Sequence, residues 1–125
     1  QHNITSNLKL ATQADVTFVG VGSLGEKSPL HIDGFVDEQE LKELQNLGAV
    51  GEMISWVYDK RGQLIDCTVN QRVASTPLKI EGNKQIYAIA AGEDKVLAIL
   101  GAVRSNMISG LITNEYTAER ILSMD

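Results

Sequence analysis

Cysteine and proline are scarce in this sequence of 125 residues, which contains one cysteine and two prolines. The single Cys67 cannot form a disulfide within the chain, and no cysteine–histidine cluster has the spacing of a structural zinc site. A lone cysteine is typical of a reducing compartment, so we expect the protein to be cytoplasmic. Because Pro29 and Pro77 are isolated and the chain has no internal repeat or low-complexity run, we predict one structural unit.

Long apolar runs and an excess of basic residues are also absent. No stretch reaches the roughly 18 apolar residues that mark a membrane-spanning helix, so we expect no membrane association. Lys plus Arg is 11 and Asp plus Glu is 16, which leaves a net charge of −5. An acidic chain is poorly suited to direct binding of duplex DNA, which depends on basic side chains that neutralise phosphates. With 43% hydrophobic and 22% charged residues, the composition is that of a globular domain.

The hydrophobic pattern predicts strands that alternate with helices. Helices are predicted over residues 4–13, 37–48, from Glu93 onward and from Asn114 onward; Asp37 is the expected cap of the second, with Glu40 as its partner. Short apolar runs predict strands over 15–20, 53–58, 64–66, 85–91 and 109–113. The strands 53–58 and 64–66 are expected to form a hairpin, and residues 67–85 to be mostly irregular.

Two helices have apolar residues at the spacing of a core-facing surface. In the helix that begins near Glu93, the expected core-facing residues are Val96, Ile99, Leu100 and Val103. In the helix that begins at Asn114, they are Ala118, Ile121 and Leu122. The alternation of strands and helices predicts an α/β fold with a mainly parallel sheet flanked by helices and interrupted by the hairpin.

In an open α/β sheet, ligands bind beyond the carboxyl ends of the strands. Three predicted segments lie there: 20–25, 92–95 and 113–114, which contain Gly22, Ser23, Gly92 and Thr113. The first matches G-x-G-x-x-G, but residues 26–29 do not read as a helix start, so we do not predict a dinucleotide site. The segment 20–25 is either a tight turn or a place where the backbone approaches a ligand closely.

Two charged residues are candidates for ligand contact. Lys95 lies in the first turn of a predicted helix, where a cation opposes the helix dipole unless it serves an anionic ligand. The alternative is that Lys95 pairs with Glu93 or Asp94, or lies in solvent. Glu52 precedes a predicted strand, where its carboxylate could accept hydrogen bonds from sugar hydroxyls or from loop amides.

No set of residues predicts a catalytic site. His31 and Asp33 form a lone pair that we expect to be a surface feature, and no nucleophile, base and acid occur together. Trp56 and Tyr58 alternate within a predicted strand, which indicates packing in the core or at an interface. We therefore predict no catalytic residues, no metal site and no cofactor.

Five ordered segments resemble the SorC-type sugar-binding transcriptional regulators. They are the segment from Ala14 to Leu24, which resembles the family's ADVALVGIGSL; Gly48 to Glu52 with Tyr58 to Gly62, which resembles GAVGD…FFDxxG; Asn70 to Val73, which resembles DDRVIG; Ile89 to Ile99, which resembles VAGGxxKxxAI; and Leu111 to Ala118, which resembles LVTDExTA.

The resemblance implies an effector-binding domain with the phosphosugar-isomerase-like α/β fold, which is similar to that of CoA transferases. It also implies that Glu52 and Lys95 contact a phosphorylated sugar. The family's earlier Gly/Thr-rich phosphate loop and its helix-turn-helix are missing from this sequence, and the chain begins at Gln1 without an initiator Met. We therefore expect residues 1–125 to be the C-terminal portion of the domain, with operator DNA bound through a part outside this chain.

The resulting expectation is a ligand-sensing domain of a bacterial regulator that is a homo-oligomer, a dimer or tetramer. The alternative is an enzyme on the same architecture, a sugar-phosphate isomerase or deaminase in which Glu52 or Asp66 acts as a general base. A third alternative is a module that serves only for oligomerisation.

Overall fold

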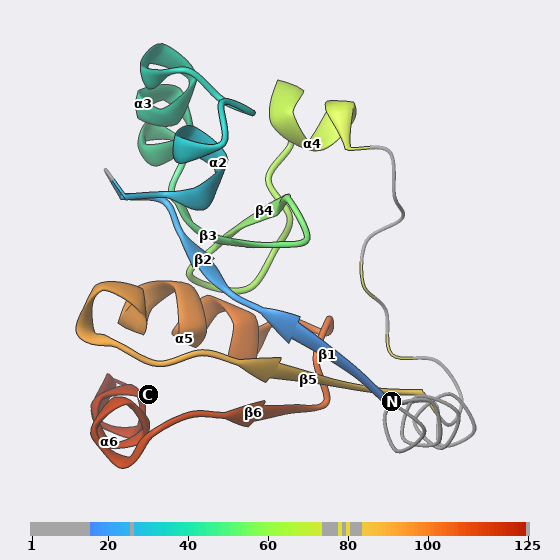
Figure 1. The fold of residues 1–125 in the computed structure, drawn as a ribbon, viewed down its shortest axis with the longest axis vertical. Coiled ribbons are helices and arrows are strands. Elements are labelled where there is room, and N and C mark those ends of the chain that lie inside the picture. The colour runs from blue at the N-terminus through green and yellow to red at the C-terminus, as the bar shows by residue number, and fades with distance from the viewer. Residues whose placement is uncertain (1–15, 26, 74–77, 79, 81–83, 125) are drawn as a thin grey trace, which may run out of the picture.

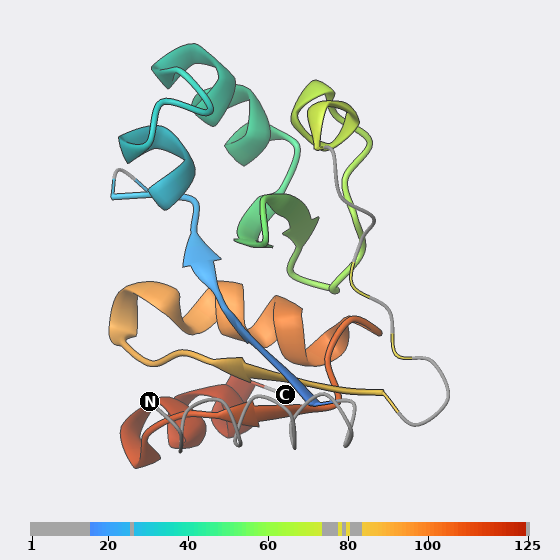
Figure 2. The same cartoon turned by 45° about the vertical axis from the view of Figure 1, so that its right-hand side comes forward.

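The computed structural model describes residues 16–25, 27–73, 78, 80 and 84–124. These residues form two three-stranded sheets, one parallel in the order β1-β5-β6 and one antiparallel in the order β2-β3-β4. Helix α5 (Val96–Arg104) lies between the two sheets in both views (Figures 1 and 2). The helix predicted over 4–13 lies outside the described residues. None of the helices within the described ranges combines the length and the apolar character that crossing a bilayer requires.

The parallel sheet contains three of the predicted strands. They are β1 (Val16–Gly20), β5 (Gln85–Ile89) and β6 (Gly110–Ile112), with Phe18 opposite Tyr87 and Ile89 opposite Ile112. This confirms the prediction of an α/β fold with parallel strands. All three strands end on the same side of the sheet, so the segments that follow them are neighbours, as the hydrogen bond from the Ala90 N–H to the Ile112 carbonyl (3.1 Å) shows.

The antiparallel strands form a separate sheet, which corrects the prediction of one interrupted sheet. Only Val21 separates β1 from β2 (Gly22–Ser23), so the chain passes directly from one sheet to the other. Strand β2 pairs with β3 (Ala49–Met53), which pairs with β4 (Trp56–Asp59). The segment predicted as a loop over 20–25 therefore contains a short strand.

The hairpin lies earlier in the chain than predicted. The expected strand over 53–58 is broken at Ile54 and Ser55, which connect β3 to β4 with φ angles of 44° and 73°. Positive φ at both central residues is the feature of a type I′ hairpin turn, which usually contains Asn-Gly. The pair Ile-Ser therefore gives no sequence signal for this turn. The expected return strand is reduced to an isolated bridge between Leu64 and Tyr58.

Three helices cover the antiparallel sheet. They are α2 (Pro29–Ile32), α3 (Glu38–Asn46) and α4 (Thr68–Arg72). The predicted capping box at α3 is confirmed, since Asp37 Oδ1 accepts from the Glu40 N–H at 2.8 Å and Glu40 Oε1 accepts from the Asp37 N–H at 3.3 Å.

Helices α2 and α4 correct two predictions. The chain does enter a helix at Pro29, with Ser28 as its N-cap, although this helix spans only four residues. The region 67–85, predicted to be mostly irregular, contains α4. Helix α4 places the buried Asn70 against β4, where its side chain accepts from the Val57 N–H at 2.8 Å and donates to the Val57 carbonyl at 2.9 Å. This long-range pairing is not visible in local sequence.

The main core lies where α5 packs between the two sheets. Val96, Ile99 and Leu100 are buried there as predicted. Val103 is exposed, because α5 ends at Arg104 and its last turn extends beyond the core. A short 3-10 helix, η1 (Glu93–Lys95), leads directly into α5. In the last helix, α6 (Glu115–Met124), Ile121 is buried as predicted, whereas Leu122 is 74% exposed, contrary to expectation.

Candidate functional site

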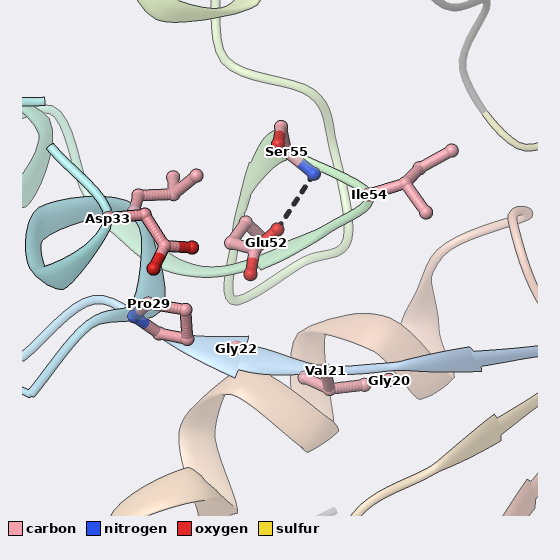
Figure 3. Close-up of a pocket in the computed structure, with 9 residues that line it drawn as sticks. Gly20, Val21, Gly22, Pro29, Asp33, Glu52, Ile54 and Ser55 are labelled. Carbon is pink, nitrogen blue, oxygen red and sulfur yellow. Dashed lines mark hydrogen bonds between the residues drawn. The ribbon is translucent and has the colours of Figure 1, made fainter. Parts of the chain in front are cut away.

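An open cavity of about 290 Å³ lies where β1 ends and β2 begins (Figure 3). Helix α2 and the turn between β3 and β4 form its other sides. The residues that line it are Gly20, Val21, Gly22, Pro29, Leu30, Asp33, Glu52, Ile54 and Ser55. The cavity therefore combines an apolar wall with two carboxylates.

Glu52 is the most buried acidic residue of this cavity, with a side chain on β3 directly opposite Gly22 on β2. A Cβ atom at Gly22 would collide with the Glu52 carboxylate, so only glycine leaves the space that this carboxylate occupies. Glu52 Oε2 accepts a hydrogen bond from the Ser55 N–H at 2.8 Å (Figure 3). The register of β2 and the tight turn together hold Glu52 in place.

Burial is the main influence on Glu52 and raises the pKa of its carboxyl group above the usual value. The Ser55 N–H and the positive charge of Lys95 oppose this rise in pKa, while the negative charge of Asp33 adds to it. Burial similarly raises the pKa of the neighbouring Tyr58, with a further contribution from the charge of Glu52. The charge of Lys95 therefore acts on Glu52.

The raised pKa of Glu52 has a consequence for stability. Because the folded state holds the proton more tightly than the unfolded state, Glu52 contributes stability at low pH that is lost as pH rises through the folded-state pKa. Glu52→Gln keeps the shape and cannot ionise. We therefore expect its free energy of unfolding, relative to that of the wild type, to increase as the pH is raised from 4 to 7.5. Urea unfolding of both proteins across this range measures the difference; a constant difference would contradict the prediction.

Lys95 ends η1, which packs against β2, and its side chain is half-buried. Within the part of the chain that the structure describes, Lys95 forms no ion pair with Glu93 or Asp94. Glu93 instead accepts hydrogen bonds from the Tyr116 hydroxyl at 2.6 Å and from the Arg120 guanidinium at 3.4 Å. The alternative in which Lys95 is neutralised by these neighbours is therefore wrong.

Gly92 and Thr113 follow the ends of β5 and β6. Gly92 has φ 126° and ψ 149°, a conformation essentially restricted to glycine, and its N–H donates to Thr117 Oγ1 at 3.1 Å. The Thr113 hydroxyl is buried and has no hydrogen-bond partner among the described residues. A buried hydroxyl of this kind is available to a ligand or to ordered water.

The six predicted contact residues are thus only partly brought together. Gly22 and Glu52 line the cavity, whereas Ser23, Gly92, Lys95 and Thr113 are not among its lining residues. Asp33 was not among the predicted contact residues; it is exposed, as expected of a surface residue, and it also lines the cavity. Ser55 was not predicted either, because it contributes a backbone N–H, a group that residue type does not reveal.

The chemistry of the cavity is that of a hydrogen-bond acceptor for hydroxyl groups. Its two carboxylates can accept from a polyol, and the apolar residues Val21, Leu30 and Ile54 can contact carbon atoms. No cluster of three or more His, Cys, Asp or Glu side chains placed to hold a metal ion occurs among the described residues. The fold and the cavity define an α/β ligand-binding domain.

Comparison with known proteins gives the family. Residues 1–123 match the family described as "Putative sugar-binding domain". The chain is 30% identical over 122 residues to the erythritol catabolism regulatory protein EryD of Brucella abortus, covering 98% of this chain and 39% of that protein. It is 32% identical over 109 residues to the sorbitol operon regulator of Klebsiella pneumoniae, covering 86% and 35%. The crystal structure of the full-length Klebsiella pneumoniae regulator SorC superposes with a TM-score of 0.72 at 29% identity, covering 94% and 39%.

This chain belongs to the sugar-binding domain family of SorC/DeoR-type transcriptional regulators. The resemblance seen in the sequence is thereby confirmed, and so is the expectation of a regulator domain rather than an enzyme, since the relatives are transcriptional regulators. The chain spans about 39% of the length of EryD and 35% of the sorbitol operon regulator.

Proposed function

We propose that this domain binds a phosphorylated sugar and thereby changes the affinity of a longer, cytoplasmic regulator for its operator. The proposal depends mainly on one observation: the buried carboxylate of Glu52 lines an open cavity and is influenced by the positive charge of Lys95. A buried carboxylate can accept two sugar hydroxyls, and a lysine beside a helix start suits a phosphate. The fold of the complete domain is proposed to be phosphosugar-isomerase-like.

In this proposal, the predicted residues form two groups, one that contacts the sugar hydroxyls and one that contacts the phosphate. Glu52 and Gly22 belong to the hydroxyl-binding end, because the described residues that line their cavity include two carboxylates and no basic side chain. Lys95, Gly92 and Thr113 belong to the phosphate end, beyond the ends of β5 and β6. Ser23 lies on β2, the strand against which η1 packs.

Control of DNA binding requires only that the sugar phosphate prefer one of two conformations of the regulator. Operator DNA would be bound by another part of the longer protein, in line with the acidic charge of this chain. A sugar-phosphate isomerase is not favoured, because the described residues that line the cavity offer no acid–base partner for Glu52 other than the exposed Asp33.

A thermal-shift screen tests the proposal. The panel contains glucose 6-phosphate, fructose 6-phosphate, fructose 1,6-bisphosphate, ribose 5-phosphate and erythritol 4-phosphate, each beside its unphosphorylated parent. A ligand that binds the native state raises the melting temperature by mass action, so at least one phosphorylated compound should raise it more than its parent. A panel without any shift would contradict the proposal.

Glu52→Gln separates recognition of the sugar from attraction of the anion. Because Glu52 accepts hydroxyl groups in this proposal, its replacement should lower the affinity for the best sugar phosphate by roughly tenfold, the cost of a charged hydrogen bond. The affinity for inorganic phosphate should not fall. Calorimetric titration of both ligands gives the comparison, and equal losses would show that Glu52 only shapes the loop.

Self-association is expected from the apolar face of the parallel sheet opposite α5, where large side chains are exposed. Phe18, Ile89 and Ile112 are 55%, 50% and 48% exposed on the face opposite α5, whereas parallel sheets are normally covered on both faces. We therefore expect the chain to form a homodimer or homotetramer. Light scattering is the test, with Phe18→Ser as the variant expected to weaken association; a wild-type monomer at high micromolar concentration would contradict it.

A further inference from the structure

Three side chains of α6 hold the segment that leads to Lys95. Thr117 Oγ1 accepts from the Gly92 N–H at 3.1 Å, and Tyr116 and Arg120 both donate to Glu93. These contacts join residues 23 to 27 positions apart in the sequence, from one helix to one short segment. Helix α6 is therefore attached to the beginning of η1 by side-chain hydrogen bonds.

The conformation of this segment decides where Lys95 lies. Gly92 has a backbone conformation that is essentially restricted to glycine, and its carbonyl accepts from the Lys95 N–H at 3.1 Å, which closes the turn of η1. A displacement at Gly92 is therefore passed to Lys95 through one turn of backbone. Helix η1 packs against β2, and the charge of Lys95 acts on Glu52.

Thr117 makes the contact that is best shielded from water among the three. Its side chain is fully buried, so water cannot replace the hydrogen bond to Gly92, whereas Tyr116, Glu93 and Arg120 are all exposed. The first turn of α6 is itself fixed, because the Thr117 N–H donates to Asn114 Oδ1 at 2.8 Å. The Thr117 hydroxyl is thus held at a rigid helix start and aimed at the Gly92 N–H.

We propose that Thr117 is a positioning residue that, through Gly92 and η1, sets Lys95 at the phosphate end of the effector site. This inference rests on the proposed function, since it assigns Lys95 to the phosphate. It predicts that Thr117 controls how strongly the site prefers a phosphorylated ligand, although Thr117 itself need not touch the ligand.

The test is a double-mutant cycle of Thr117 and Lys95. The readout is the dissociation constant of the unphosphorylated sugar divided by that of the best sugar phosphate of the panel, so a high ratio means a strong preference for the phosphorylated ligand. Thr117→Val keeps the side-chain shape without the acceptor and should lower this ratio roughly three- to tenfold, the net value of one hydrogen bond. Thr117→Ser keeps the acceptor and should restore the ratio. Adding Thr117→Val to Lys95→Ala should lower the ratio no further, because both act on one contact.

Matched variants separate positioning from folding. Ser123→Ala removes an exposed hydroxyl from the same helix and should leave the ratio unchanged, because this hydroxyl donates to the Arg120 carbonyl within α6. If Thr117→Val does not fold, Tyr116→Phe removes the contact to Glu93 from an exposed position and should lower the ratio in the same direction by a smaller factor. An unchanged ratio in that variant would then overturn the inference.

The outcomes distinguish the two proposals. Equal loss of affinity for sugar and sugar phosphate in Thr117→Val, or full additivity with Lys95→Ala, would show a merely structural role for Thr117 and would leave the proposed function intact. A wild-type protein with no preference for phosphorylated ligands would overturn the proposed function, and the inference with it.

Discussion

Replacing Tyr58 by alanine is expected to lower the free energy of unfolding by about 3–5 kcal/mol, the usual cost of truncating a buried aromatic ring. Tyr58 is fully buried on β4, within the main core between α5 and the sheets. Its hydroxyl donates to the Ala98 carbonyl of α5 at 2.6 Å. The substitution removes both the packing and this link between the hairpin and the central helix.

The loss is large compared with the whole stability of a small domain, which is about 5–15 kcal/mol. Tyr58→Phe is the matched control, because it keeps the ring and removes only the hydroxyl, at an expected cost of about 1 kcal/mol. Urea unfolding followed by circular dichroism measures both variants. A loss below about 1 kcal/mol for Tyr58→Ala would show that the hairpin contributes little to the core.

Lys95→Ala is expected to weaken binding of the best sugar phosphate by roughly 10- to 150-fold, equivalent to 1.5–3 kcal/mol for a hydrogen bond to a charged group. Lys95 is half-buried beside β2, and among the described residues no carboxylate forms an ion pair with it. Its charge is therefore available to a ligand anion. Calorimetric titration at low ionic strength, where charge interactions are least screened, gives the dissociation constants.

The stability of Lys95→Ala should differ little from that of the wild type, because the side chain lies near a helix end and supports no ion pair of the described residues. Lys60→Ala provides the control for the loss of one positive charge, since Lys60 is exposed in the turn after β4. If both variants lost the same affinity, the effect would be one of net charge, and Lys95 would not belong to the site.

Local patterns of the sequence identified much of the secondary structure. The apolar runs at β1, β5 and β6 indicated strands of a parallel sheet, because such a sheet selects continuous hydrophobic segments. They did not indicate that Phe18, Ile89 and Ile112 would be exposed on one face of that sheet. The pair Asp37 and Glu40 indicated the start of α3, because a capping box is made by residues three positions apart. Each of these signals depends on neighbours in the chain, which is why sequence alone could find them.

The candidate site was harder to predict, since it depends on contacts between distant residues. Glu52 was identified by its motif and position, but its burial results from the pairing of β2 with β3, which places it opposite Gly22. Asp33 joined the cavity only because α2 folds against this junction. The charge of Lys95 influences Glu52 because η1 packs against β2, the strand paired with the one that carries Glu52. The spacing of these residues along the chain does not indicate that they lie close in space.

By itself, the sequence determined the class of fold, the family and the chemistry of the candidate residues, because these follow from hydrophobic periodicity, ordered motifs and side-chain type. Only the tertiary structure decided that the hairpin forms a second sheet and that Ile54 and Ser55 make the turn. The same is true of the link from Thr117 to the segment before Lys95. The physical reason is that strand pairing and side-chain hydrogen bonds over 25 or more residues are selected by the packing of the whole domain, which leaves no local trace.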